Sequence, residues 1–520
     1  MRRLSSPTLG CLAEVRRIGQ AHLQDLWRKA MKLRGVTRIC GIALFVGLTA
    51  ITVTTAQEAK PKTKHHRYKV VDVGTFGGPN ADTLVPPPAA QILTNSGLFV
   101  GTAETKLVDP FAPNCVDSDC LVQSGLFNVA GVSVNIGTLR HGYSGGPISV
   151  NNFGVSVGFS QNGELDPLTG NPELKAALWE GGQVIDLGTL GGNGASANAI
   201  NDRGQIFGGA LNTIPDSDSS FPFFVPGATQ VHAVLWEHGK IFDLGTLGGT
   251  DSVVYQSNEL GQAMGISFTD NVRHGSTLLP TTHPFLWERG RMEDIGSLGG
   301  TFSEGYGLNR HGEVVGFSLL DGDAIEHPFL WKHGILTDLG TFGGDNGEAW
   351  EINDRGHIAG WADLPASQSH HGFLWKNGHL IDLGAPHGNP CSKGETVNHF
   401  DQVVGDSGEC GVGGDPFLWE NDDIVAIRDL ILPGSGRFVF DAFDINDQGE
   451  IVSFCTTPQG HVHVCLLMPT EEPAAHFPAA DSQTSTFMIP ARRYPATGER
   501  RISMLGRWRT SQTSGRISGR

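Results

Sequence analysis

The chain has 520 residues, of which 71 are glycine and only 18% are charged, a composition typical of many short strands joined by tight turns. Its formal net charge is −17, but both ends are basic, and residues 40–491 carry 20 basic against 51 acidic side chains. So acidic a body repels phosphate backbones, which argues against a nucleic-acid partner.

Residues 31–56 have the pattern of a signal peptide. Basic side chains at Lys32, Arg34 and Arg38 precede an apolar run over 39–53, and small residues end the segment at Ala56. The run is shorter than the ~20 residues of a spanning helix, so cleavage near Ala56 is favoured over an uncleaved anchor. We therefore expect export, to the cell surface or the extracellular space with the periplasm as the alternative, and no membrane contact beyond this segment. Residues 1–30 are then an over-long start, and 57–67 a linker.

One phrase, Asp-Leu-Gly-Thr-Leu-Gly-Gly, recurs at intervals of 44 to 63 residues. Copies start at Asp72, Asp186, Asp243, Asp294 and Asp338, and weaker versions start at Asn135, Asp382 and Asp429. Two further phrases recur once in nearly every unit, at a similar distance from the first phrase. The first is a turn of the type Asn-x-x-Gly, at Asn151, Asn201, Asn258, Asn309, Asn353 and Asn446, with a version one residue shorter at Asn95–Gly97 and one lacking the glycine at Asn398–Asp401. The second is Leu-Trp, which ends at Trp179, Trp236, Trp287, Trp331, Trp375 and Trp419.

Each repeat unit predicts four short strands. In the unit that ends at Gly245, strands are expected over 197–200, 205–209, 231–236 and 240–244, the first two joined by the turn Asn201–Gly204. Four strands in about 44 residues match one blade of a β-propeller. Trp and Leu are expected to pack between adjacent blades, because one four-stranded sheet cannot bury both of its faces alone.

The sequence thus predicts an all-β fold, a β-propeller of about eight four-stranded blades over residues 68–470. Seven blades are the alternative, because the second unit and the last two depart from the pattern. The pattern opens with a fourth-strand phrase at 68–76 and stops after a third-strand phrase at 461–468. The first strand is therefore expected to join the last blade and close the ring, which removes two exposed edges. Residues 471–520 lack apolar periodicity and predict a disordered basic tail.

These phrases resemble the HAF-repeat family of probable extracellular bacterial proteins. The likeness lies in the His-x-x-Leu-Trp segments 232–236, 283–287 and 327–331 and in the glycine-rich copies, and it spans about 68–468. The resemblance implies export and a repeat architecture, and it implies no particular activity.

Six cysteines remain once the leader is removed: Cys115, Cys120, Cys391, Cys410, Cys455 and Cys465. An even number in an exported chain indicates disulfides, and the chain has no Cys-x-x-Cys pair that would favour a metal site. The positions favour three bonds. Cys391–Cys410 flanks the turn 398–401, Cys455–Cys465 flanks the turn 458–461, and Cys115–Cys120 closes a small loop.

No motif assigns a cofactor, a metal or a catalytic group. The glycine-rich phrase lacks the Gly-Lys-Ser/Thr ending of a phosphate loop. The repeated Asp, and the His at 232, 283 and 327, are expected to be structural, because one active site needs a few unique residues. Asp216–Ser220 alternates oxygen ligands as calcium loops do, but it lacks their glycine and distal glutamate.

Four units carry inserts between their second and third strands, at about 102–124, 161–175, 211–230 and 268–282. In a propeller these links open on the same face as the links from fourth to first strands, and long loops on a rigid scaffold often bind ligands. The candidate ligand-binding residues there are Phe221, Phe223, Phe224, His274 and His283, with a local mini-core as the other interpretation of the phenylalanines. We expect a monomeric binding module for carbohydrate or protein. The alternatives are a propeller enzyme, such as a polysaccharide lyase or hydrolase with unique acids or histidines in its channel, and a structural envelope component.

Overall fold

The computed structural model describes residues 65–83, 91–115, 120–216 and 229–473, all of which belong to one compact unit, 63–520. The predicted start, the signal peptide, most of the linker and the tail from residue 474 lie outside these residues, as do Phe221, Phe223 and Phe224. Within the described residues no helix is both long and apolar enough to cross a membrane.

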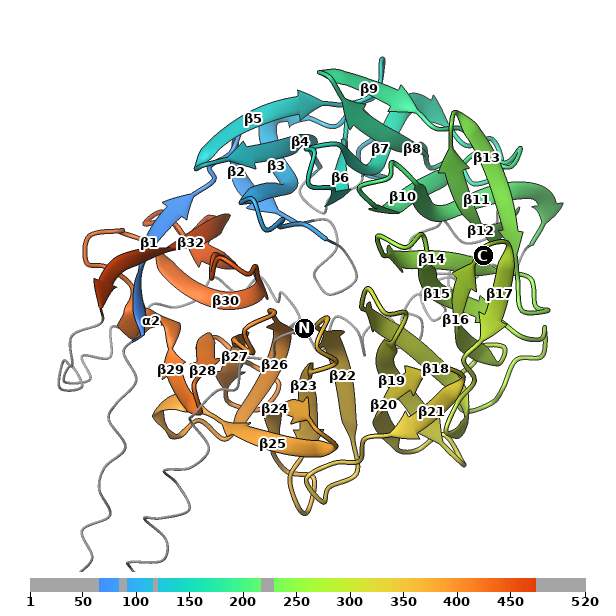
Figure 1. Ribbon diagram of the computed structural model, residues 1–520. Coiled ribbons are helices and arrows are strands. Elements are labelled where there is room, and N and C mark those ends of the chain that lie inside the picture. Colours follow the sequence, from blue (N-terminus) through green and yellow to red (C-terminus); the bar gives the residue numbers. More distant parts are fainter. Residues whose placement is uncertain (1–64, 84–90, 116–119, 217–228, 474–520) are drawn as a thin grey trace, which may run out of the picture. The chain divides into compact units, whose positions relative to one another are not determined.

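Thirty-two strands form four-stranded antiparallel sheets, which we number 1 to 8 (Figure 1). Sheet 1 holds β2 (Gly77–Asp82), β3 (Leu98–Val108), β4 (Leu121–Val129) and β5 (Val132–Gly137). Sheet 2 holds β6 (Gly145–Val150), β7 (Ser156–Leu165), β8 (Pro172–Glu180) and β9 (Gln183–Asp186). Sheet 3 holds β10 (Ala195–Ile200), β11 (Ile206–Pro215), β12 (Thr229–Glu237) and β13 (Lys240–Gly245). Sheet 4 holds β14 (Ser252–Ser257), β15 (Ala263–Phe268), β16 (Thr282–Glu288) and β17 (Arg291–Asp294).

The second half of the chain repeats this plan. Sheet 5 holds β18 (Gly299–Leu308), β19 (Val314–Leu320), β20 (Glu326–Lys332) and β21 (Ile335–Asp338). Sheet 6 holds β22 (Gly347–Ile352), β23 (Ile358–Asp363), β24 (His370–Lys376) and β25 (His379–Gly384). Sheet 7 holds β26 (Cys391–Val397), β27 (Val403–Gly408), β28 (Phe417–Glu420) and β29 (Asp423–Ala426). Sheet 8 holds β30 (Phe438–Ile445), β31 (Ile451–Thr456), β32 (Val462–Pro473) and β1 (His66–Asp72). Residues 65–473, apart from the undescribed gaps, also contain a 3₁₀ turn, η1 (Pro386–Gly388), and one short helix, α2 (Ile427–Leu430).

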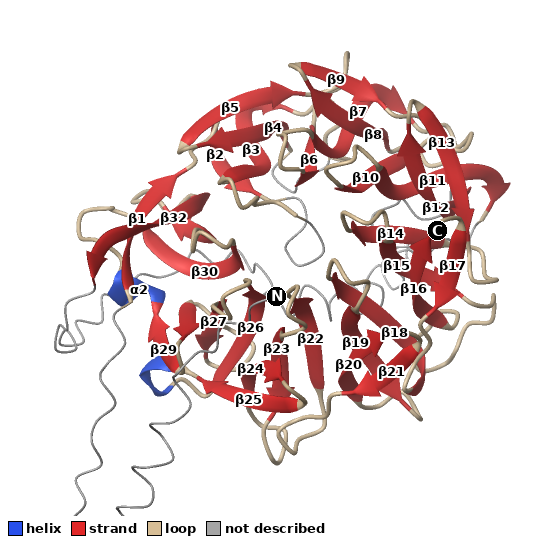
Figure 2. Cartoon of the chain, in the orientation of Figure 1, coloured by secondary structure: helices blue, strands red, loops and turns tan. Residues whose placement is uncertain are grey.

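The count of eight follows from the strand pairing. Among the described residues, the only strand pairing between sheets 4 and 5 is the single parallel pair Thr282–Phe302, so they are two units and not one. The sheets follow one another around an axis, with the fourth strands β5, β9, β13, β17, β21, β25, β29 and β1 on the outside (Figures 1 and 2). Strand order and arrangement define a β-propeller of eight blades, as predicted.

The fourth strand of sheet 8 comes from the start of the pattern. β1 pairs antiparallel with β32, for example Val70 with Leu467 and Asp72 with Cys465. The predicted pairing of the opening segment with the last sheet is therefore found, although β1 covers 66–72 and not 68–76. Sheet 8 also packs on sheet 1, since Phe443 and Val464 share a core cluster with Phe99.

Leucine and tryptophan of the Leu-Trp phrase pack between neighbouring sheets. Leu235 of sheet 3 shares a core cluster with Trp287 of sheet 4, and Leu286 shares one with Trp331 of sheet 5. Burial of each such side chain contributes about 1.5–3 kcal/mol. The predicted packing between blades is therefore confirmed.

The Asn-x-x-Gly turns join first and second strands and also link neighbouring sheets. In the turn of sheet 3, Asn201 Oδ1 accepts the N–H groups of Arg203 and Gln205, while Gly204 adopts a φ of 75°. Asn201 Nδ2 donates to the carbonyl of Asn258 in sheet 4 at 3.1 Å. The same bond runs from one turn to the next in order through Asn151, Asn201, Asn258, Asn309, Asn353, Asn398 and Asn446, whose amide reaches the carbonyl of Thr94.

The turn of sheet 1 corrects one detail of the sequence analysis. Thr94, and not Asn95, occupies the first position, because the N–H of Gly97 donates to the Thr94 carbonyl and Thr94 Oγ1 accepts the N–H groups of Ser96 and Leu98. This turn is therefore of normal length. Its hydroxyl caps the turn as the asparagine oxygen does elsewhere, but it has no amide to extend to the next sheet.

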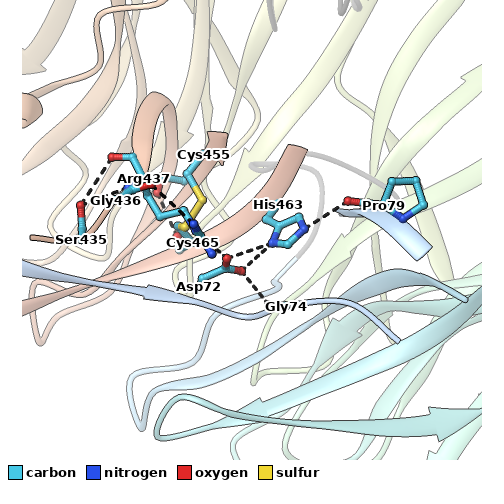
Figure 3. Close-up of a disulfide and its surroundings, with 10 residues drawn as sticks. Asp72, Gly74, Pro79, Ser435, Gly436, Arg437, Cys455, His463 and Cys465 are labelled. Atoms are coloured by element: carbon cyan, nitrogen blue, oxygen red, sulfur yellow. Dashed lines mark hydrogen bonds and ion pairs between the residues drawn. A yellow bond between two sulfur atoms is a disulfide. The ribbon is translucent and has the colours of Figure 1, made fainter. Parts of the chain in front are cut away.

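All three predicted disulfides are present: Cys115–Cys120, Cys391–Cys410 and Cys455–Cys465. The last joins the adjacent strands β31 and β32, and both of its cysteines are fully buried (Figure 3). Three disulfides are typical of a protein that matures in an oxidising compartment.

Candidate functional site

The links between second and third strands open on one side of the sheets, together with the links between fourth and first strands. We call this side the insert face. Part of each of the first three predicted inserts is regular structure, because β3, β7 and β11 run on to Val108, Leu165 and Pro215. In sheets 5, 6 and 8 the corresponding link is short, for example residues 321–325 between β19 and β20.

The candidate residues chosen from the sequence have protein partners where the structure describes them. His283, in β16, forms a hydrogen bond with Asp294 of β17, with 2.9 Å between Nδ1 and Oδ1. His274 lies in the insert of sheet 4, where Nε2 is 2.9 Å from Thr281 Oγ1. Phe221, Phe223 and Phe224 lie outside the described residues, so the structure brings none of the five together.

His283–Asp294 is one of a repeated set of pairs. In each, a histidine on the third strand lies against the aspartate of the glycine-rich phrase on the fourth strand, and that aspartate also accepts the N–H of the glycine two residues later. The pairs are His232–Asp243, His283–Asp294, His327–Asp338, His371–Asp382 and His463–Asp72, and the glycines are Gly245, Gly296, Gly340, Gly384 and Gly74. The structural interpretation of these residues is confirmed. The pairing itself was missed, although four of the five pairs share a spacing of 11 residues.

The glycine-rich phrase forms a closed turn and not a phosphate cradle. Thr189 Oγ1 donates to the carbonyl of Gly192 at 2.7 Å and accepts the N–H of Gly191 at 3.2 Å. Gly191 has a φ of 103°, which a side chain would strain. The N–H group that a phosphate would need is thus already satisfied within the loop.

Non-repeated polar residues gather at the insert face of sheets 5, 6 and 7. They come from the strand ends nearest that face, and we call them the mixed-charge cluster: Glu326 of β20, Glu348 and Trp350 of β22, Trp361 and Asp363 of β23, His370 of β24 and Lys393 of β26. No repeat phrase marks these positions, so sequence patterns gave no signal for them. The cluster thus brings acidic and basic side chains from three sheets to one part of the insert face.

Lys393 lies against two aromatic rings within this cluster. Its Nζ is 4.6 Å from the ring centroid of Trp361 and 5.5 Å from that of Trp350, within the range of a cation–π interaction. Trp350 is fully buried and donates from Nε1 to Glu348 Oε2 at 2.6 Å. The two tryptophans therefore form a fixed wall beside the ammonium group.

Burial and neighbouring charges shift the protonation of two members. Burial, and after it the charge of Glu348, raises the pKa of Glu326 to about 8, against an opposing effect of Lys393. Burial, with the charge of Lys393, lowers the pKa of His370 to about 4. At neutral pH Glu326 is therefore a protonated carboxyl that can donate a hydrogen bond, and His370 is neutral.

Three polar groups of the cluster have no partner among the described residues. Lys393 Nζ makes no hydrogen bond or ion pair there, and neither does the carboxyl of Glu326. Trp361 Nε1 is buried without an acceptor. A buried unsatisfied group such as Trp361 Nε1 costs about 1–3 kcal/mol unless water or a ligand binds it.

A second pair of acidic residues, Asp406 and Asp441, lies in sheets 7 and 8. Burial, and after it the charge of Asp441, raises the pKa of Asp406 well above its usual range, while the N–H of Gly414 donates to both oxygens of Asp406 at 2.9 Å. Across the described ranges, no set of three or more His, Cys, Asp or Glu side chains is placed to hold a metal ion. Of the calcium-like segment Asp216–Ser220, only Asp216 is described.

No family model matches the chain, and no curated protein matches it. Among solved structures it is similar to the β-propeller domain of the Trilobed protease from Pyrococcus furiosus, at 10% identity over 63% of this chain and 96% of that one, with a TM-score of 0.37. It is also similar to TolB from Acinetobacter baumannii, at 11% identity over 61% of this chain and 80% of that one, with a TM-score of 0.27. The Trypanosoma rangeli sialidase matches at 10% identity over 77% of this chain and 55% of its own, with a TM-score of 0.29. Similarity at this level concerns the fold alone.

Proposed function

We propose that this chain is an exported β-propeller that binds carbohydrate at the insert face, with the mixed-charge cluster of sheets 5–7 at the centre of the site. The observation that carries the proposal is a set of polar groups at Glu326, Lys393 and Trp361 that have no hydrogen-bond partner in the described part of the chain and come from three adjacent sheets. Carbohydrates are ligands rich in hydroxyl groups that can satisfy donors and acceptors together.

Two further features support this proposal. The residues repeated in most sheets hold turns and strand pairs, so their chemistry is used within the fold. The three disulfides fit a protein that works outside the cytoplasm, in agreement with the signal-peptide pattern of residues 31–56.

A second candidate function is hydrolysis or elimination on a polysaccharide. It is favoured by Glu326, because a carboxyl whose pKa is raised to about 8 beside another carboxyl, that of Glu348, has the protonation of a general acid. Binding remains the first proposal, because Glu348 is 2% exposed and its Oε2 is already occupied by Trp350.

A glycan array probed with the full chain, its disulfides intact, tests both. We expect the wild type to bind a limited set of glycans and Lys393→Met to lose them, whereas Lys240→Met, which removes an exposed lysine at the start of β13, leaves binding unchanged. Equal binding by wild type and Lys393→Met would contradict the proposed site. New reducing ends or unsaturated products from a bound glycan, abolished by Glu326→Gln, would replace the binding function with the enzymatic one.

A further inference from the structure

We propose that Lys393, Asp363 and Glu326 form a subsite for neighbouring hydroxyl groups of a neutral sugar ring, so that the ligand is a neutral saccharide and not a uronate or an amino sugar. This inference rests on the proposed function, and it specifies the ligand class for the same site. It follows from the donors and acceptors that the three side chains present, and from the charges around them.

The subsite offers both a donor and an acceptor. Lys393 Nζ has all three of its N–H donors unpartnered among the described residues. Asp363 Oδ2 accepts from the backbone N–H and the side-chain amide of Asn346, at 3.1 and 3.2 Å, while Oδ1 has no partner in the same part of the chain. Two adjacent sugar hydroxyls can therefore satisfy the pair, one accepting from Lys393 and the other donating to Asp363 Oδ1.

Glu326 adds a third group, which can donate a hydrogen bond when its carboxyl is protonated but only accept when it is ionised. Its carboxyl has no hydrogen bond among the described residues, and it lies within the electrostatic influence of Lys393, Glu348 and Asp363. In its protonated form it can donate to a ring or hydroxyl oxygen. Once ionised it can only accept, and it adds a third negative charge beside Glu348 and Asp363.

The surrounding charge selects against ionised sugars. A uronate would bring a carboxylate next to Glu348 and Asp363, in a body whose residues 40–491 have a net charge of −31. An amino sugar would bring an ammonium group next to Lys393, whose charge already lowers the pKa of His370. A ligand without net charge avoids both repulsions and can still contact Lys393, Asp363 and Glu326.

The test is isothermal titration of the full chain with neutral gluco-, manno- and galacto-oligosaccharides, galacturonate oligomers and chitosan oligomers, at pH 6.5 and pH 9. We expect binding of a neutral series at pH 6.5 and a loss of about tenfold or more with Lys393→Met or Asp363→Asn, since each removes a charge-assisted hydrogen bond. Affinity of the wild type should fall at pH 9, where Glu326 is ionised. Glu326→Gln, whose amide does not ionise, should lose less affinity between pH 6.5 and pH 9 than the wild type loses.

Results other than those expected would refute the ligand class, the subsite or the proposed function, and the three cases can be distinguished. Preferred binding of galacturonate or chitosan, lost with Lys393→Met, would refute the neutral-sugar inference while the proposed carbohydrate site stands. Neutral binding that is unchanged by both Lys393→Met and Asp363→Asn would refute the subsite. Absence of binding to all three classes, with no glycan retained on the array, would refute the proposed function itself. Thermal unfolding of each variant, with Lys240→Met as the control, separates loss of binding from loss of folding.

Discussion

His463 Nδ1 lies 2.8 Å from Asp72 Oδ1, although 391 residues separate the two in the chain. The other four His–Asp pairs join residues 11 apart within one sheet. Here the aspartate comes from β1 and the histidine from β32, so a repeated local contact becomes a contact between the two ends of the described chain (Figure 3). Arg437 Nε lies 2.7 Å from Asp72 Oδ2. The Asp72 carboxylate therefore binds two side chains of sheet 8 and helps to hold β1 against β32, a contact that we call the β1–β32 seam.

Asp72→Asn should destabilise the fold more than Asp338→Asn, which breaks an equivalent pair within sheet 5. We expect a loss of about 2–3 kcal/mol in the free energy of unfolding for Asp72→Asn, since it weakens charge-assisted contacts to both His463 and Arg437. About 1 kcal/mol is expected for Asp338→Asn, whose carboxylate is 42% exposed. Urea unfolding at pH 7 measures the free energy of unfolding of both variants. Equal losses would contradict the larger contribution that we assign to Asp72 at the β1–β32 seam.

The same carboxylate should also govern stability in acid. Burial tends to raise the pKa of Asp72, but the hydrogen bonds from His463, Gly74 and Arg437 outweigh burial and lower this pKa to about 2. Because the folded value lies below the unfolded one, the contribution is present above about pH 4 and is lost as the pH falls through about 2. The stability difference between wild type and Asp72→Asn should therefore shrink between pH 4 and pH 2, and a constant difference would argue against this linkage.

The asparagine bonds between sheets can be tested at Asn309, which is 4% exposed. Asn309→Asp removes the donor to the Asn353 carbonyl and places a carboxylate 2.7 Å from Glu313 Oε2. We expect the free energy of unfolding to fall by about 2–4 kcal/mol. Asn377→Asp, at an exposed turn with a φ of 53°, is the matched control and should change stability by less than about 0.5 kcal/mol. Similar values for the two variants would show that the bond to the next sheet adds little.

The disulfide within sheet 8 should matter more than the one in the insert of sheet 1. Replacing Cys455 and Cys465 together with alanine removes a cross-link and two fully buried side chains, with an expected loss of about 3–4 kcal/mol. The double alanine variant of Cys115 and Cys120, which are only partly buried, should lose about 1–2 kcal/mol. Thermal unfolding shows which of the two double variants loses more stability. A larger loss for the variant of Cys115 and Cys120 would be inconsistent with the deeper burial of Cys455 and Cys465.

His65 should make stability depend on pH in the opposite direction. The hydrogen bond to Glu420 raises the pKa of His65, burial lowers it, and the bond to Asp423 raises it further, with a net increase. A raised folded pKa means that the contribution is complete below about pH 6.5 and is lost as the pH rises through the folded value. His65→Gln should therefore cost about 1–2 kcal/mol at pH 6 and less at pH 9. Urea unfolding curves of wild type and His65→Gln at pH 6 and pH 9 measure the loss of stability. A larger loss at pH 9 would contradict a raised pKa of His65.

What the sequence alone determined was the local and repeated part of the structure. Turns of the type Asn201–Gly204, alternating strands and the spacing of cysteines such as Cys455 and Cys465 recur or lie close together in the chain, so their geometry could be predicted from short segments. The offset between the opening fourth-strand phrase and the terminal third-strand phrase even predicted the pairing of β1 with β32.

Only the tertiary structure decided which unique residues meet. Glu326, Asp363 and Lys393 stand in three different units and match no repeated phrase. They come together because the start of β20, the end of β23 and the start of β26 all lie at the insert face. The protonation of Glu326 depends on burial and on charges distant in the sequence, which no local pattern encodes. Because local patterns show only repeated residues, the sequence pointed to His283, whose Nδ1 is already bonded to Asp294.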